Sequence, residues 1–494
     1  MSRTSGTITS DVAESVRPTR VRYGVLAFAG ALSMITYLDR ACIASAAPSI
    51  VRDLHLESIA DLKWVFFAFA LAYALFQVPS GWLGDVFGPR KVLIWIVLWW
   101  SLFTVLTGMV GLSLGGLVMG LAFLIVVQLL FGVGDAGGFP NITRALHNWF
   151  PRQERGFAQG VMWMSGRLMA GLTPLIWMVL VEGIAKSGTA EVRSPAARLL
   201  PPLLPWRAVF WLFGLVGVAW VIGFAWWFRN RPEEKAGVNA AELAWIRSGQ
   251  ERPAARHGGV PWRRLLGDRN LWALCMMYGL QSYGWYFYIT YLPSFLERRF
   301  HVPADSLCGA IYKGGPLLLG AVGCLLGGLL TDRFVRRTGN LRWGRRLFGV
   351  IGHTLTCLCF LACRYAPSAF WFFLAISFAG FSTDLGMAAG WSSCQDIGRR
   401  YAGIVAGFMN TCGNLGGALA GWSTGFVVQQ YLGASAVASG VAANSFSAPQ
   451  KEAAIYPADQ LNFLIFATAY AIGVLCWLRI DATRAVAAEE NDGP

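Results

Sequence analysis

The chain has 494 residues, of which 55% are hydrophobic and only 14% are charged, and its mean hydropathy is +0.49. Soluble globular chains carry about 25% charged residues, so this composition excludes a soluble protein and indicates a membrane protein. The net charge of +14 does not imply a nucleic-acid partner, because basic pairs such as Arg90-Lys91 and Arg345-Arg346 lie in short segments beside apolar runs, where membrane topology accounts for them.

Twelve apolar runs are long enough to cross a hydrocarbon core about 30 Å thick. They cover residues 23–50, 63–83, 91–112, 116–139, 156–183, 206–228, 270–297, 307–331, 347–366, 368–391, 401–430 and 461–480. An even number places both chain ends on one side of the membrane, and the distribution of Lys and Arg makes that side cytoplasmic. The sequence therefore predicts an all-α, multi-pass protein surrounded by lipid.

The first run contains two opposite charges, Asp39 and Arg40. A charge at bilayer depth costs about 2.5–3.5 kcal/mol or more, so ionisable residues inside a membrane are candidates for function. Adjacent residues on a helix point about 100° apart and cannot pair well with each other. We therefore expect each to find a partner on another span, unless the two only neutralise one another or extend to the headgroups.

The fourth and fifth runs carry further polar side chains at membrane depth. Gln128 and Asp135 are two turns apart on roughly the same face, and Arg167 lies near the middle of the fifth run among small residues. Proton coupling requires a carboxyl group whose charge is set by burial and by a nearby arginine. Asp135 is such an acid or a simple partner of Arg167 or Arg155, and Arg167 is a cavity cation or half of a structural ion pair.

A polar segment divides the runs six and six. We expect a cytoplasmic tail at 1–22, a six-helix bundle at 23–228, a cytoplasmic linker at 229–269 with a short surface helix near 240–246, a second bundle at 270–480 and a cytoplasmic tail at 481–494. Two stretches on the outer side, 186–205 and 432–459, are rich in Ala, Ser and Pro and are predicted to be loops.

The two halves repeat. Gly81-Trp82-Leu83-Gly84-Asp85 follows the second run, and Gly328-Leu329-Leu330-Thr331-Asp332 follows the eighth, 247 residues later. The same shift carries four residues near Arg167 onto the eleventh run and places Arg167 opposite Asn414; the pairs are Gly160 with Gly407, Met162 with Met409, Gly166 with Gly413, and Leu168 with Leu415. Repeated six-helix halves with a site near the midplane are typical of transporters.

The polar residues of the second half are mainly aromatic and amide side chains. They are Gln281, Tyr283, Tyr286, Tyr288, Tyr291, Asp384, Trp391, Ser392, Asn410 and Asn414. Rings offer flat apolar contact and amides offer hydrogen bonds, a combination that suits a hydroxylated ligand, although single tyrosines also serve as packing or interfacial residues. Asp384 lies past the midplane and is a further candidate.

The sequence gives no sign of an enzyme. Its five histidines are dispersed, and no nucleophile–base pair or metal-ligand spacing accompanies them. We therefore expect no metal and no cofactor.

Several blocks resemble a known family. Gly81 to Lys91 is similar to the loop signature of the major facilitator superfamily, and the more specific resemblance is to its anion:cation symporter family. The blocks that carry it are Tyr37-Leu38-Asp39-Arg40, Gln77-Val78-Pro79-Ser80-Gly81, Gly132 to Pro140, Trp149 to Gly156, and Arg400 to Gly403 through Asn410 to Gly417.

The resemblance implies two six-helix bundles that work by alternating access and import an organic anion, most often a sugar acid such as a hexonate, hexarate or hexuronate, with protons. It implies that Arg40 holds the substrate carboxylate and that Asp39 and Asp135 carry the protons. It also implies a cavity lined by Tyr73, Trp391 and Asn410, to which we add Gln128, Tyr286, Asn414 and Arg167 as candidate binding residues. Asp85 with Arg90, and Asp332 with Arg333, are the expected parts of a cytoplasmic gate.

This sequence departs from the family pattern at three positions. The family usually has arginine where Gln128 stands, glutamate at Asp135 and a basic residue at Val86. We expect Arg167 to replace the missing cation, because a planar guanidinium binds carboxylates bidentately and stays charged. Asp39, Asp135, Arg40 and Arg167 would then form one coupled set.

The proton gradient across a bacterial inner membrane is the expected driving force, for a protein that acts as a monomer. The alternatives are a carrier of another monocarboxylate or dicarboxylate, or a sensor of the same fold that does not transport. An exporter of cationic drugs shares the fold, but two arginines in the cavity do not suit it.

Overall fold

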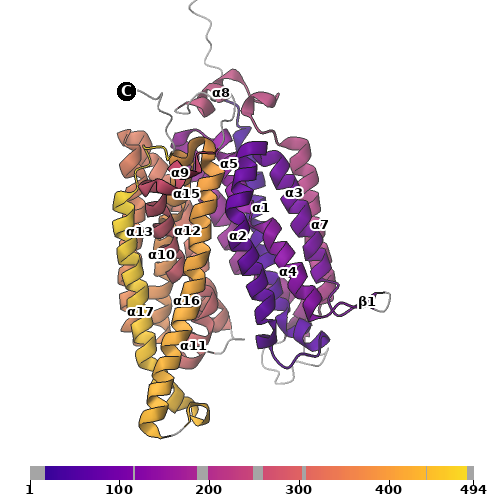
Figure 1. Ribbon diagram of the computed structural model, residues 1–494, viewed down its shortest axis with the longest axis vertical. Helices are drawn as coiled ribbons and strands as arrows, with labels where there is room; N and C mark the ends of the chain where they lie inside the picture. The colour runs from indigo at the N-terminus through magenta and orange to yellow at the C-terminus, as the bar shows by residue number, and fades with distance from the viewer. Residues whose placement is uncertain are drawn as a thin grey trace, which may run out of the picture.

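A computed structural model describes residues 17–114, 117–185, 198–248, 260–302, 307–440 and 442–486. Two groups of long, roughly parallel helices lie side by side, one from each half of the chain (Figure 1). The first group consists of α1 (Arg22–Asp53), α2 (Lys63–Phe87), α3 (Pro89–Thr107), α4 (Leu121–Asp135), α5 (Gly138–Trp149), α6 (Arg155–Trp177) with a terminal π-helical turn (Met178–Glu182), and α7 (Trp206–Trp227).

The second group repeats this plan. It consists of α10 (Arg269–Thr290), α11 (Leu292–Phe300), α12 (Leu307–Thr338), α13 (Leu341–Arg364), α14 (Ala369–Leu385), α15 (Met387–Gly398), α16 (Ala402–Ser439) and α17 (Ala448–Arg479). Each of the twelve predicted spans lies on one long helix or on two consecutive helices, and the fourth, seventh and tenth spans each break in two. The predicted all-α fold is confirmed.

Ten helical stretches are long and apolar enough to cross a membrane by length and composition. One of them, Ala369–Ser439, contains both the tenth and the eleventh span. The seventh span, α10, is not among the ten, because its tyrosine and amide side chains lower its hydropathy. The chain is thus a multi-pass membrane protein.

The segments between spans add little regular structure. The predicted linker helix is present as α8 (Ala240–Arg247), followed by α9 (Trp262–Gly267). Two small antiparallel hairpins pair β1 (Ser113–Leu114) with β2 (Leu117–Val118), and β3 (Ile184–Ala185) with β4 (Arg198–Leu200).

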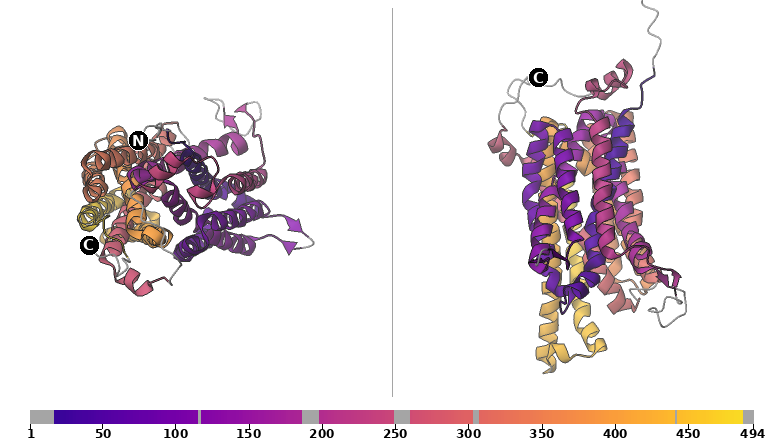
Figure 2. Two further views of the ribbon diagram at one scale, coloured as in Figure 1. Left: turned by 90° about the horizontal axis from the view of Figure 1, so that it is seen from above. Right: turned by 90° about the vertical axis from the view of Figure 1, so that its right-hand side faces the viewer.

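The prediction of a loop over 432–459 is wrong. α16 continues to Ser439 and α17 begins at Ala448, so most of this stretch is helical and extends beyond the rest of the bundle (Figure 2). Alanine favours helix, which explains why the composition was misleading. The other predicted loop lies largely outside the described residues, which resume at Arg198.

The two halves meet where α6 packs on α12 and α2 packs on α16. Glycines allow the closest approach: a side chain at Gly81 would overlap the carbonyl of Gly403, and one at Gly328 would overlap that of Gly156. Both contacts obey the 247-residue shift found in the sequence. Close helix crossing through small residues is the usual way in which membrane helices associate.

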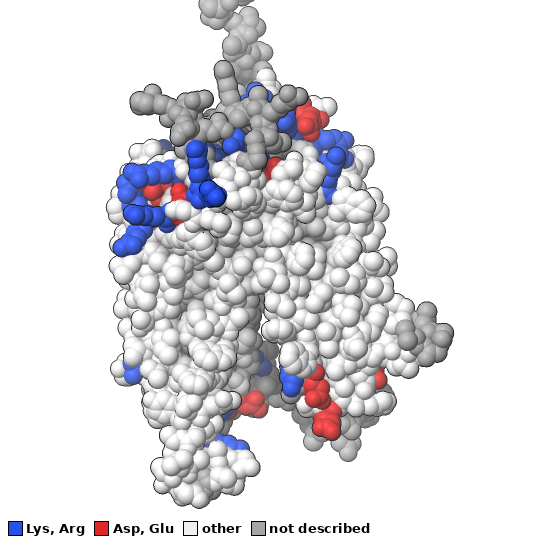
Figure 3. All heavy atoms as spheres, in the orientation of Figure 1, with Lys and Arg blue, Asp and Glu red and all other residues white. Residues whose placement is uncertain are grey.

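The molecule has one strongly basic end, where Lys and Arg side chains gather (Figure 3). We call this the basic end; α5 and the linker helix α8 lie there (Figure 1). At the opposite end, the surface is hollowed between the two halves by a cleft that opens outward (Figure 3).

Candidate functional site

Arg40 and Asp135 form an ion pair inside the first half. The Arg40 Nε donates to Asp135 Oδ2 at 2.5 Å, joining α1 to α4. The Arg40 guanidinium also lies over the ring of Tyr73, 4.1 Å from its centroid. The Arg40 side chain is 21% exposed, whereas that of Asp135 is 1% exposed. An incoming anion therefore meets the arginine first and the carboxylate behind it.

Several polar atoms around this pair lack a hydrogen-bond partner among the described residues. They are Oδ1 of Asp39, Oδ1 of Asp135 and Nη2 of Arg40, all buried. Asp39 also lies within electrostatic reach of Asp135, so two buried carboxyl groups are close together behind one arginine. Unsatisfied buried polar groups are costly, and such groups are retained where they bind a ligand or a proton.

Arg167 does not join this pair. Its Nε and Nη2 donate to the two carboxylate oxygens of Asp384 on α14, at 2.7 and 3.0 Å, and its Nη1 donates to the Tyr37 hydroxyl at 2.9 Å. The expectation of one set of two acids and two arginines within the first half is wrong. The protein holds two separate pairs, and the second one crosses the boundary between the halves.

Amide and phenol side chains connect the halves beside these pairs. The Asn410 side chain on α16 donates to the Tyr73 hydroxyl on α2 at 3.2 Å. Tyr286 on α10 donates to Oδ1 of Asn414 at 3.2 Å, and the Asn414 amide donates to the Asn410 carbonyl. Tyr286 and Asn414 remain half-buried, so they retain some contact with solvent.

Gln128 does not lie with the charged groups as the sequence suggested. Its side-chain amide donates to the Thr107 hydroxyl at 3.1 Å, which ties α4 to α3. Two turns of helix separate it from Asp135, but the amide satisfies its hydrogen bonding inside the first half. The structure thus places the Gln128 amide on Thr107, and its contact with substrate stays a prediction.

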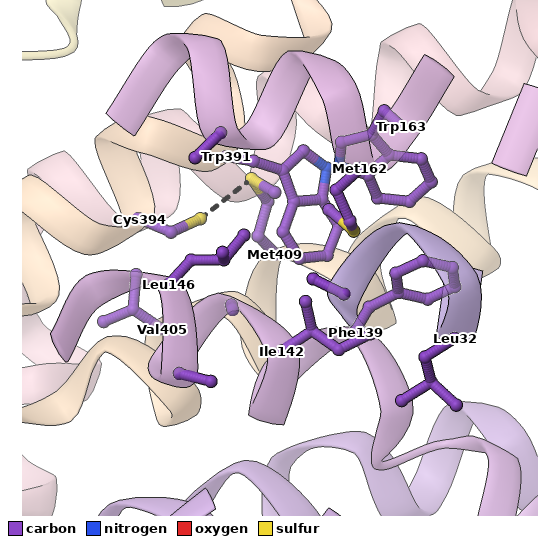
Figure 4. Close-up of a cluster of buried hydrophobic side chains, with 14 of the residues drawn as sticks. Leu32, Phe139, Ile142, Leu146, Met162, Trp163, Trp391, Cys394, Val405 and Met409 are labelled. Carbon is purple, nitrogen blue, oxygen red and sulfur yellow. Dashed lines mark hydrogen bonds between the residues drawn. The ribbon is translucent and has the colours of Figure 1, made fainter. Parts of the chain in front are cut away.

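Trp391 lies in a layer of three closely packed rings, in which Phe139 and Trp163 stack and Trp391 is tilted against both. Its ring centroid is 4.9 Å from that of Trp163 and 6.2 Å from that of Phe139, and Phe139 stacks on Trp163 at 4.6 Å. The three rings come from α15, α6 and α5 and lie close together in Figure 4. Trp391 is fully buried, so this ring layer closes the boundary between the two halves at this point.

The loop aspartates cap helices of the opposite half. Asp85 accepts from the backbone N–H groups of Gly403 and Ile404 at 3.0 and 2.8 Å, at the start of α16. Asp332 accepts from those of Gly156 and Phe157 at 3.0 and 2.6 Å, at the start of α6. A carboxylate at a helix N-terminus satisfies free N–H groups and complements the helix dipole.

The expected basic partners of these aspartates are different residues. Arg90 donates to the Ala225 carbonyl within the first half, and Arg333 is exposed. Instead Arg144 lies 3.5 Å from Asp85, and Arg345 donates to Asp332 at 3.1 Å. The partners come from neighbouring helices, so sequence proximity to the loop did not identify them.

Sequence reasoning missed one residue at this end. Asp396 on α15 is buried and lies 2.7 Å from Arg155, 2.9 Å from Arg345 and 3.7 Å from Arg152. It thereby joins the two halves through Arg152 and Arg155, while Arg345 binds it from within the second half. A carboxylate in an otherwise weakly polar stretch, Ser392 to Ile397, was the available signal.

Among the described residues, no group of three His, Cys, Asp or Glu side chains is placed to hold a metal ion. The site is thus a set of arginines, carboxylates, amides and rings. Such groups bind an anion and move protons.

Comparison with known proteins finds relatives that are named as transporters of organic anions. The chain is 33% identical over 413 residues to a probable sulfoacetate transporter of Cupriavidus necator, covering 83% of this chain and 88% of that protein. It is 29% identical over 439 residues to a probable galactarate/D-glucarate transporter of Escherichia coli, covering 85% and 90%. A D-galactonate transporter of Escherichia coli is 27% identical over 433 residues, covering 84% and 91%.

A solved structure of a proton:xylose symporter superposes with a TM-score of 0.66 at 13% identity, covering 94% of this chain and 97% of that one. At that identity the likeness concerns the fold alone. Residues 29–421 match the Major Facilitator Superfamily. The chain therefore belongs to the Major Facilitator Superfamily, a family of membrane transporters and not of enzymes.

Proposed function

We propose that this protein imports a small organic anion together with protons. The observation that carries the proposal is the Arg40–Asp135 pair, with a partly exposed guanidinium in front, a buried carboxylate behind and Asp39 close by. An arginine fork fits a carboxylate or a sulfonate. The relatives named for sulfoacetate, galactarate, glucarate and galactonate support an anionic substrate.

The proposed coupling is an exchange of partners on Arg40. Protonation of Asp135 removes the charge that holds Arg40, and the substrate carboxylate takes its place. Loss of the proton on the other side lets Asp135 pair with Arg40 again and expels the anion. Proton and substrate act through their different affinities for the two states of the protein. Asp39, buried within electrostatic reach of Asp135, keeps its proton throughout this exchange, so Asp135 alone takes up and releases the proton that accompanies the carboxylate on Arg40.

The conformation supports the first step of such a cycle. The basic end is closed by Asp85, Asp332 and Asp396, and the cleft opens at the other end. We propose that the basic end faces the cytoplasm of a bacterial cell, as positive residues do in inner-membrane proteins, and that the cleft faces outward. The structure then corresponds to an outward-facing state of a monomer, with Asp85 and Asp332 as parts of its inner gate.

A sugar acid is the proposed substrate. Arg40 would bind a carboxylate, while Tyr73, Asn410, Tyr286 and Asn414 offer rings and hydrogen bonds for hydroxyl groups. A shorter anion such as sulfoacetate is the second candidate, favoured by the similarity to the sulfoacetate relative.

Uptake into proteoliposomes tests the proposal. Radiolabelled galactonate, galactarate and sulfoacetate would be offered with the outer side acidic, and again without a pH gradient. We expect accumulation of at least one anion, stimulated by the gradient and abolished by a protonophore. Equal uptake with and without the pH gradient would contradict proton coupling. Binding without uptake would indicate a sensor.

Substitution of Arg40 tests the site. Arg40→Lys keeps the charge but removes the bidentate fork, so we expect the apparent affinity for the anion to fall about tenfold or more. Arg207→Lys is a matched control. Arg207 also pairs with a partly exposed aspartate, Asp53 at 2.8 Å, but this pair contains none of the proposed substrate-binding residues. Equal affinities in the wild type and Arg40→Lys would contradict the assignment.

A further inference from the structure

The two central ion pairs share one design. In each, a carboxylate occupies an edge of the guanidinium and an aromatic ring covers its face. Arg40 lies 4.1 Å from the Tyr73 centroid and pairs with Asp135, whereas Arg167 lies 4.3 Å from the Trp285 centroid and pairs with Asp384. Because the ring covers the face of the guanidinium, its edge remains as the place where a carboxylate binds.

Both arginines act on the same space. Tyr37 and Tyr286 are each within electrostatic reach of Arg40 and of Arg167. Tyr37, Tyr286 and the Trp285 ring over Arg167 are half-buried, so this wall is not fully sealed. A single elongated ligand in the cavity would thus have one arginine towards each end.

The surroundings of the second pair are shaped to hold it. A side chain at Gly320 would overlap Oδ2 of Asp384, and one at Gly166 would lie 2.6 Å from the Tyr37 ring. Small residues at both positions therefore make room for the pair. A buried ion pair adds little net stability compared with apolar packing, so stability alone does not account for this arrangement between two moving halves.

We propose that the Arg167–Asp384 pair is a second anion-binding position, which takes the second negatively charged group of a dianionic substrate in exchange for the Asp384 carboxylate. The proposal rests on the function proposed above and specifies its substrate class: a dicarboxylate, or a carboxylate that also carries a sulfonate. Arg40 then binds one end of the substrate and Arg167 binds the other.

Asp384 would carry a proton when it releases Arg167. The titratable groups that act on it come from five helices: Arg167 on α6, Tyr37 on α1, Tyr288 on α10, Cys324 on α12 and Tyr470 on α17. Only Arg167 is a cation, and none of the others is a carboxylic acid. Removal of Arg167 from Asp384 therefore leaves protonation as the way to neutralise the buried carboxylate.

Charge balance gives the number of protons. With all carboxyls ionised, Arg40, Arg167, Asp39, Asp135 and Asp384 sum to one negative charge, and a proton on Asp39 makes the set neutral. A first substrate charge on Arg40 is then balanced by a proton on Asp135, and a second charge on Arg167 by a proton on Asp384. The protein would carry one proton with a monoanion and two with a dianion, without net charge movement.

Two substrate pairs that differ by one charge test this. Galactarate differs from galactonate by a terminal carboxylate, and sulfoacetate differs from propionate by a sulfonate in place of a methyl group. Proton flux and radiolabel uptake would be measured together in proteoliposomes. We expect the wild type to prefer each dianion by about tenfold or more and to carry two protons with it.

The variants separate binding from coupling. Arg167→Gln should lower the apparent affinity for the dianion about tenfold while changing that for the monoanion less than about threefold. Asp384→Asn should lower the proton count for the dianion from two to one and make its uptake electrogenic. Arg167→Gln/Asp384→Asn removes both charges together, so it keeps a neutral core if a single variant fails to fold, and it should lose the dianion preference.

Arg298→Gln is the matched control. Arg298 also donates to both carboxylate oxygens of an aspartate, Asp459, at 2.9 and 3.2 Å, and to the hydroxyl of Tyr291 at 3.1 Å. All three residues lie within the second half. It should not alter the dianion preference. Equal wild-type uptake of mono- and dianions, or equal loss of both in Arg167→Gln, would overturn this inference and leave the proposed function intact. Uptake of none of the four anions would overturn both.

Discussion

The two ends of the boundary between the halves are built differently. At the basic end the halves touch through glycine crossings, carboxylate caps and the arginines around Asp396. At the opposite end a cleft separates them, and Gly421 and Gly425 on α16 have no heavy atom within 4 Å of an added side chain. Closure thus rests on apolar packing across the boundary, as between Trp163 and Trp391, together with a few directional polar contacts. Directional contacts of this kind form and break as units, which suits a boundary that has two arrangements.

Loss of Asp396 should have the largest effect on the stability of the basic end. Asp396→Asn leaves Arg155 and Arg345 buried without their shared carboxylate, and breaking a buried pair costs about 3–5 kcal/mol. We expect a lower midpoint of thermal unfolding in detergent and faster hydrogen exchange in α15. Asp53→Asn at the open end removes a half-exposed partner of Arg207 and should cost about 0–1 kcal/mol. Similar losses in both variants would mean that the two ends are equivalent.

The glycine crossings should give the next largest effect. A methyl group at Gly328 would overlap the Gly156 carbonyl, and overpacking of this kind costs about 1–3 kcal/mol. We expect Gly328→Ala to lower the unfolding midpoint and to expose the basic end. Gly425→Ala places the same methyl group on an open helix surface, where alanine favours helix over glycine by about 1 kcal/mol, so this control should be neutral or stabilising. A destabilised Gly425→Ala would contradict the difference between the ends.

Substitution of the two capping aspartates, Asp85 and Asp332, should have the smallest effect on the basic end. Asp85→Asn keeps one acceptor oxygen but turns an amide towards a second N–H donor, and loss of a cap costs about 0.5–2 kcal/mol. We expect faster hydrogen exchange of the Gly403 and Ile404 amides. Asp332→Asn should have the larger effect, because it also removes a buried partner of Arg345. Equal exchange in both variants would show that Arg345 adds nothing to its cap.

Much of the fold could be predicted from the sequence, because spans are set by local composition and the repeat is visible as a fixed shift. The proximity of Arg40 and Asp135 could also be predicted from the sequence, because both are charged residues inside apolar runs. Pair partners were harder to predict. Arg167 has Asp384 as its partner across 217 residues of chain, and only the packing of α6 against the second half decides this.

The failures have the same cause. Gln128 shares a helix face with Asp135 by periodicity, but a 15-residue helix offers neighbours on several sides, and Thr107 of α3 satisfies its amide. Arg90 and Arg333 adjoin the loop aspartates in sequence, but side chains from other helices lie nearer in space. Periodicity gives the direction of a side chain on its own helix, whereas its partner depends on tertiary packing.

The ring layer of Phe139, Trp163 and Trp391 has a consequence for energy conservation. Protons move through proteins along hydrogen-bonded chains, and a layer of closely packed aromatic rings offers no continuous chain, just as apolar constrictions stop conduction in channels by excluding water. In the closed state, the layer is therefore expected to act as an electrical insulator. Under the proposed proton symport, it would prevent protons from leaking through an empty carrier, so that they cross only together with the substrate.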